Sequence, residues 1–259
     1  MRSKNSTTVA MLAVVSGVCA AVTLTAAHAR AQEASPELQQ ANRRLVEYQT
    51  KDARAALQPV ATRADTDGAV AVTLGRILEQ EKKYDEAAKT LAKAADLLPG
   101  DPAPQVYLGE TYVHAKKFSE AEKAFGMAAQ LAQAAVEKDE HNAAAWYYLG
   151  VAQLRIKQYD KAFASLAKAK NAGFESALVL FQQGATRVWQ GKWKEAVDLL
   201  TCAINENSGL AYAYYYRGLA QDKLGKKDQL VLDMDRFLKV APQAPEADKA
   251  QAVLKAAKR

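Results

Sequence analysis

Glycine recurs along this chain at an almost constant interval. Gly75, Gly109, Gly150, Gly184 and Gly218 are separated by 34, 41, 34 and 34 residues. Each glycine ends an apolar stretch whose hydrophobic residues can be read at helical spacing. A period of this length indicates a repeat protein, in which each unit packs mainly against its neighbours. The chain is therefore expected to fold as a stack of similar units.

A second series of residues runs in step with the glycines and indicates what each unit is. Nine residues after a glycine comes an aromatic residue, closely followed by an alanine: Tyr84 and Ala87, Phe118 and Ala121, Tyr159 and Ala162, Trp193 and Ala196. Small residues let two helices approach to about 8–10 Å, and the aromatic ring can fill the wider gap at the end of the pair. Alanine also supplies 54 of the 259 residues and proline only 7, which favours helices. Each unit is thus predicted to be a pair of antiparallel helices.

These residues resemble the tetratricopeptide repeat family, whose helix-turn-helix unit has a period of 34 residues. The best single copy spans residues 143–176 and carries Trp146, Leu149, Gly150, Tyr159, Ala162, Leu166 and Ala169. The resemblance implies an all-α fold, a right-handed superhelical solenoid of helix pairs closed by a C-terminal capping helix. It also implies an adaptor or scaffold that binds another protein, such as an envelope or secreted protein.

The resemblance divides the chain into five units, at residues 68–101, 102–142, 143–176, 177–210 and 211–244. A degenerate helix pair is expected before them, at residues 34–67, and a polar capping helix after them, at residues 245–259. The unit at residues 102–142 has seven extra residues, so its second helix is expected to be two turns, or about 10 Å, longer. Leu131 and Val136 would then project apolar surface, as an alternative contact site.

The first 29 residues have the pattern of a secretion signal. A short basic front precedes an apolar run at residues 9–24, and Ala27 and Ala29 form the small-x-small pattern that signal peptidase recognises. We expect cleavage after Ala29, with Ala31 as the alternative. The run is short for a bilayer span of about 20 residues, although a retained anchor is the other interpretation. The mature chain is therefore expected to be exported, periplasmic or secreted, without an integral membrane span.

Charge and residue spacing argue against several classes of function. The formal net charge of +6 falls to +4 without Arg2 and Lys4, which is too small a surplus for a dedicated nucleic-acid binder. His114 and His141 are the histidines that follow the signal, and neither has a cysteine or carboxylate at ligand spacing. Glycine-rich phosphate loops are absent as well. We therefore expect no enzyme, no metal site and no cofactor.

In the family that this chain resembles, the first helix of each pair lines a concave groove. The resemblance places these positions there: Val72, Arg76, Val106, Glu110, His114, Tyr147, Val151, Leu154, Phe181, Ala185, Val188, Tyr212, Tyr215 and Leu219. Apolar and aromatic residues gather toward the C-terminal units, and the expected partner-binding residues are Tyr147, Leu154, Phe181, Val188, Tyr212, Tyr215 and Leu219. Ordinary packing between helices, or a polysaccharide stacked on the same rings, are the alternative interpretations.

Charge is distributed unequally along the chain. Residues 30–142 carry 15 basic and 18 acidic groups, whereas residues 143–259 carry 18 and 11. An acidic partner at the C-terminal end is therefore an expectation. The predicted turns within the units are rich in lysine, at Lys82, Lys83, Lys116, Lys117, Lys157, Lys192, Lys226 and Lys227. We interpret these lysines as offsetting the negative ends of the first helices, with a binding stripe as the alternative, and expect Asp85, Ser119 and Asp160 to cap the second helices.

Overall fold

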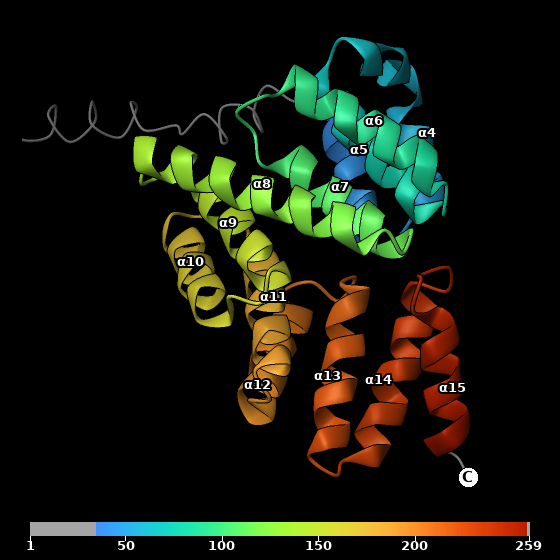
Figure 1. Cartoon of the computed structure of the whole chain (residues 1–259). Coiled ribbons are helices and arrows are strands. Elements are labelled where there is room, and N and C mark those ends of the chain that lie inside the picture. Colours follow the sequence, from blue (N-terminus) through green and yellow to red (C-terminus); the bar gives the residue numbers. More distant parts are fainter. Residues whose placement is uncertain (1–34, 258–259) are drawn as a thin grey trace, which may run out of the picture.

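The computed structural model describes residues 35–257, which form helices and no strand (Figure 1). This confirms the predicted all-α fold, while the predicted signal peptide at residues 1–29 lies outside the described residues. The helices are α3 (Pro36–Val46), α4 (Thr50–Leu57), the 3-10 helix η1 (Gln58–Asp65), α5 (Gly68–Gln80), α6 (Tyr84–Leu97), α7 (Ala103–His114), α8 (Phe118–Lys138), α9 (Ala143–Arg155), α10 (Tyr159–Asn171), α11 (Ser176–Trp189), α12 (Trp193–Glu206), α13 (Ala211–Lys223), α14 (Lys227–Val240) and α15 (Ala247–Ala257).

The helices stack as pairs. Every α-helix from α3 to α15 packs against the next one in the chain. The first helices of the pairs also contact one another, α3 with α5, α5 with α7, α7 with α9, α9 with α11 and α11 with α13. These helices form a continuous inner layer, which is the layering of the predicted solenoid.

Close approach within each pair depends on the repeated glycine. A Cβ atom placed on Gly150 would lie 2.6 Å from Cγ of Leu166 and 3.2 Å from the carbonyl oxygen of Ala162, both on the partner helix α10. Gly75, Gly109, Gly184 and Gly218 meet the second helices of their own pairs in the same way. The aromatic positions are less regular, because Phe118 is 66% exposed and does not fill the gap that the sequence assigned to it.

The turns inside the pairs correct one expectation. Lys82, Lys116 and Lys157 adopt a left-handed backbone, with φ between 61° and 64°, and glycine takes this position in the two following turns. The second helices of these three units begin without a side-chain cap hydrogen bond. Asp85 lies in the first turn of α6 and not at its N-cap, so the predicted capping by Asp85, Ser119 and Asp160 is wrong. The left-handed residue closes the C-terminus of the first helix, where the following N–H groups of Lys83, Lys117 and Gln158 donate to the carbonyl oxygens of Leu78, Tyr112 and Gln153.

Helix α8 is the longest helix among the described residues, with 21 residues. Its C-terminal turns pack against α9, where Val136 joins a cluster with Ala145 and Leu149. Val136 is only 3% exposed, so the expectation that it projects apolar surface is wrong. The added turns bury Ala132 and Val136 against the start of the next unit, whereas Leu131 is partly buried.

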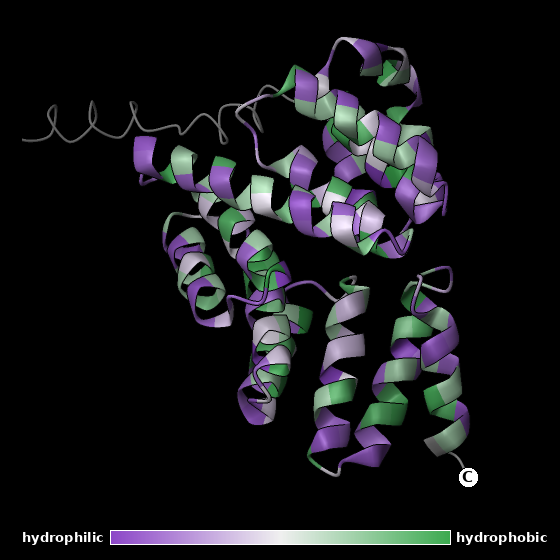
Figure 2. Cartoon of the chain, in the orientation of Figure 1, coloured by the Kyte–Doolittle hydropathy of each residue, from purple (hydrophilic) through white to green (hydrophobic). Residues whose placement is uncertain are grey.

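Polar and apolar residues are mixed on the helices (Figure 2). Within residues 35–257, no helix has the length and apolar character needed to cross a bilayer. The buried apolar side chains pack between neighbouring helices.

Candidate functional site

The inner face, formed by side chains of α5, α7, α9, α11 and α13, has a polar N-terminal part. Nδ1 of His114 on α7 contacts a carboxylate oxygen of Glu79 on α5. Arg155 on α9 donates to Glu110 on α7 at 2.9 Å. Both pairs join one unit to the next, so they contribute to the stacking of the solenoid as well as to its inner charge.

A second set of polar contacts runs beside these pairs. Arg76 on α5 donates to Oδ1 of Asn42 on α3 at 2.9 Å, and its guanidinium lies 4.6 Å from the ring centroid of Tyr107 on α7. Tyr107 in turn meets Tyr148 of α9 edge to face, with centroids 6.3 Å apart. The charged groups of this part of the inner face are thus largely satisfied by one another.

The environment of His114 favours its charged form. Burial opposes protonation, but the hydrogen-bonded Glu79 carboxylate and the charges of Glu110 and Glu246 outweigh it and raise the pKa of the imidazole above its usual value. Glu246 lies near the C-terminal end of the chain, between α14 and α15. Glu246 also accepts a hydrogen bond from Tyr212, whose hydroxyl contacts that of Tyr48, so the last unit lies close to the first helices.

Two of the predicted partner-binding residues lie in the packing between helices. Tyr147 is 8% exposed and stacks on Phe174 with ring centroids 4.2 Å apart and an interplanar angle of 12°. Leu154 is 3% exposed and packs with Ala162 and Ala185. Little of either side chain is available to a partner in this conformation.

Four other predicted residues keep part of their surface accessible. Phe181 and Val188 on α11, and Tyr215 and Leu219 on α13, are partly buried on the edge of the C-terminal core. Trp189, next to Val188, is 57% exposed. Because α11 packs directly against α13, these side chains form an accessible apolar strip, which we name the α11–α13 strip.

Tyr212, the remaining predicted residue, takes part in a contact between the two ends of the solenoid. Tyr48, in the turn between α3 and α4, donates to the Tyr212 hydroxyl at 3.3 Å, and their ring centroids are 5.6 Å apart. Tyr212 donates to the carboxylate of Glu246. Val46 and Tyr48 also pack against the hydrophobic cluster of α11 to α14. The turn between the first two helices therefore covers one end of the inner face.

Sequence reasoning missed the residues that complete this arrangement. Glu79 and Arg155 continue the helical rows of predicted inner positions, three residues after Arg76 and four after Val151, so extending those rows would have found them. Tyr48 offers no comparable signal, since its contact with Tyr212 spans 164 residues. Among the described residues, no three His, Cys, Asp or Glu side chains gather into a group that could hold a metal ion.

Comparison with known proteins gives a consistent assignment. Two family models, both of the tetratricopeptide repeat, match residues 38–102 and 125–176 and residues 78–127, which together span more than half of the chain. No curated protein matches it. Among solved structures, TTC0263, a thermophilic TPR protein of Thermus thermophilus, is similar over 74% of this chain and 99% of its own, with 16% identity and a TM-score of 0.57.

A chain of the APC/C hetero-tetramer Cut9-Hcn1 is also similar, with 16% identity and a TM-score of 0.56. The match covers 86% of this chain but only 42% of the other, so this chain spans less than half of that relative. At these identities the likeness concerns the fold alone.

Proposed function

Because the chain belongs to the tetratricopeptide repeat family, we propose that it is an adaptor that binds a segment of another protein and catalyses no reaction. A solenoid of helix pairs suits this role, since its stacked inner helices offer an extended binding surface. We assign the partner segment to the α11–α13 strip.

The observation that supports this assignment is the accessible apolar surface of the strip. Phe181, Val188, Tyr215 and Leu219 are only partly buried, and Trp189 is 57% exposed. Aromatic rings give large contact area for few rotatable bonds, so a partner that covers them loses little side-chain entropy there. The polar part of the inner face offers less, because its charged groups already have partners within the chain.

The contact between Tyr48 and Tyr212 limits how a partner can enter. A segment on the strip either lies beside Tyr48 or displaces it from Tyr212 and from the apolar cluster beneath. The first arrangement leaves the solenoid closed at this end, whereas the second couples binding to its opening.

Substitutions on the strip test the proposal. Val188→Asp or Leu219→Asp should abolish capture of the native partner from an envelope extract, because a charge replaces an apolar contact at the centre of the surface. Leu232→Asp is the matched control, since Leu232 is 61% exposed on the second helix α14. Cross-linking followed by mass spectrometry would locate the partner. If the variants kept the melting temperature of the unmodified protein and all captured the partner equally well, the assignment would be contradicted.

A saccharide is the second candidate occupant, because partly exposed tyrosine rings can stack on sugar faces as well as on peptide. Glycan binding by the purified protein, lost in Tyr215→Ala while the variant stays folded, would assign the strip to an envelope or exported polysaccharide. Capture of a protein that depends on Leu219 and is unaffected by glycans would exclude it.

We further propose that the protein works after export, in the periplasm or outside the cell, and without residues 1–29. N-terminal sequencing of the exported protein should begin at Arg30 or Gln32, after one of the two small-x-small sites. Recovery of a full-length, membrane-embedded chain would contradict the proposed export and cleavage.

A further inference from the structure

The turns within the helix pairs line one edge of the solenoid, and their charge differs between its two halves. We name residues 80–86 and 114–120 the N-terminal rim, and residues 156–161, 187–195 and 222–229 the C-terminal rim. The N-terminal rim has four basic and four acidic residues, whereas the C-terminal rim has eight basic and four acidic ones. The basic surplus of the C-terminal half is therefore concentrated on this edge.

Ion pairing strengthens the difference between the two rims. On the N-terminal rim, Lys83 pairs with Glu81 at 3.2 Å, and Lys117 reaches Asp85 of the preceding turn at 2.8 Å. On the C-terminal rim, Glu195 pairs with Arg187 at 2.9 Å, and none of the rim's lysines, all within residues 35–257, makes an ion pair. The eight basic and four acidic residues of this rim leave a net charge of +4, and its lysines are not held in ion pairs.

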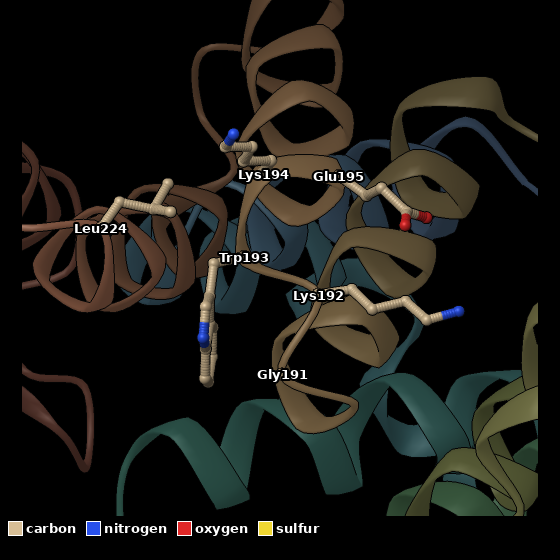
Figure 3. Close-up of a pocket in the computed structure, with 6 residues that line it drawn as sticks. All are labelled: Gly191, Lys192, Trp193, Lys194, Glu195 and Leu224. Carbon is tan, nitrogen blue, oxygen red and sulfur yellow. The ribbon is translucent and has the colours of Figure 1, made fainter.

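The same rim has an apolar hollow between two neighbouring turns (Figure 3). It is lined by Gly191, Lys192, Trp193, Lys194, Glu195 and Leu224, so that Trp193 of one turn and Leu224 of the next supply its apolar surface. In Figure 3, Lys194 lies on the same side as the Trp193 ring and Leu224. A second hollow lies at the following turn, lined by Gly225, Lys226, Lys227, Asp228 and Gln229. Lysines therefore flank both hollows.

We propose that the C-terminal rim is a second binding surface, which takes an extended acidic segment of a protein. Its carboxylates meet Lys194, Lys226 and Lys227, and an apolar side chain between them lies against Trp193 and Leu224. Packed helices are about 8–10 Å apart, a distance that about three residues of extended chain span. Side chains three residues apart point to opposite faces of a β-strand but share one face of a polyproline II segment, so acidic residues at every third position of such a segment can reach lysines on successive turns.

This occupant fits the rim better than a lipid surface does. On this rim Trp189 is the one large apolar side chain that is mostly exposed, and Trp193 and Leu224 are partly buried, whereas insertion into a bilayer needs a face of several projecting apolar side chains. The rim adjoins the α11–α13 strip at Val188 and Trp189, but Trp193, Lys194, Leu224, Lys226 and Lys227, which would hold the segment, lie outside the strip, so the two proposals can be tested separately.

A charge-matched pair of variants tests the proposal on the mature protein. The probe is a fluorescein-labelled peptide of about ten residues, with glutamate at every third position and leucine between. Lys194→Glu combined with Lys226→Glu should weaken binding by about tenfold or more at low salt, and binding to the unmodified protein should weaken as salt rises. Lys82→Glu combined with Lys116→Glu is the control, because all four lysines are exposed and the net charge is the same.

The rim would be supported as the site if the control variant bound the peptide within about twofold of the unmodified protein and if Leu219→Asp still bound it. No peptide binding at low salt, or equal losses in the two charge variants, would overturn it. Tighter binding to phosphatidylserine vesicles or to duplex DNA than to the peptide would overturn the assignment to a protein segment. Loss of peptide binding in Leu219→Asp would move the peptide to the α11–α13 strip and also overturn the rim, without affecting the proposed adaptor function.

Discussion

Replacing Gly150 by alanine should destabilise the protein, although alanine is the better helix former. The added Cβ would lie 2.6 Å from Cγ and 2.9 Å from Cδ2 of Leu166, and 3.2 Å from the carbonyl oxygen of Ala162. Leu166 is fully buried, so it cannot move aside into solvent. Either its side chain leaves its rotamer or the two helices of the pair separate.

Two opposing effects set the size of the change. Alanine in place of glycine favours a helix interior by about 1 kcal/mol. Forcing an extra methyl group into a packed core costs about 1 to 3 kcal/mol. The close contacts are with Cγ of a buried leucine and with backbone, so we expect the cost to dominate and the free energy of unfolding to fall by about 1 to 2 kcal/mol. Urea unfolding followed by far-ultraviolet circular dichroism measures this change.

Gly126 provides a matched control, because a Cβ there meets nothing within 4 Å. Gly126→Ala on α8 should raise the free energy of unfolding by about 0.5 to 1 kcal/mol. In a Leu166→Ala background, Gly150→Ala should become neutral or stabilising, since the contacts with Cγ and Cδ2 are gone. If Gly150→Ala instead matched Gly126→Ala in the unmodified protein, close approach of the helices at Gly150 would be refuted.

Three further substitutions probe the packing and closure of the solenoid. Asp233→Ala should cost about 3 kcal/mol in urea unfolding, because it leaves Arg217 without the buried carboxylate that accepts two hydrogen bonds, at 2.7 and 2.9 Å; a loss near zero would contradict this. Tyr48→Ala should open the closed end and increase the radius of gyration in small-angle X-ray scattering, whereas an unchanged radius would count against the closure. His114→Gln should lower the free energy of unfolding more at about pH 5.5 than at about pH 8.5. Because folding raises the pKa of His114, protonation stabilises the fold below the unfolded-state pKa of about 6.5, and this stabilisation is lost as the pH rises through the folded-state pKa. Unfolding at both pH values measures the effect, and a constant difference would contradict it.

The candidate site was only partly predictable from the sequence. The resemblance to the tetratricopeptide repeat placed Phe181, Val188 and Leu219 at inner positions, and a residue's direction on a helix follows from its register in the repeat. Register does not determine exposure. Tyr147 is buried because Phe174, in the turn before α11, stacks on its ring, and no local pattern relates these two residues.

The sequence by itself determined the unit and its repetition. The contact of a small residue such as Gly150 with a large side chain such as Leu166 on the next helix recurs once in each unit. Such contacts involve only residues that are close in the chain or one unit apart. Closure of the solenoid was decided only in the tertiary structure. Whether Tyr48 reaches Tyr212 depends on small rotations between units, which accumulate over the whole stack. Since each rotation results from many side chains packed together, no single residue encodes the position at which the two ends meet.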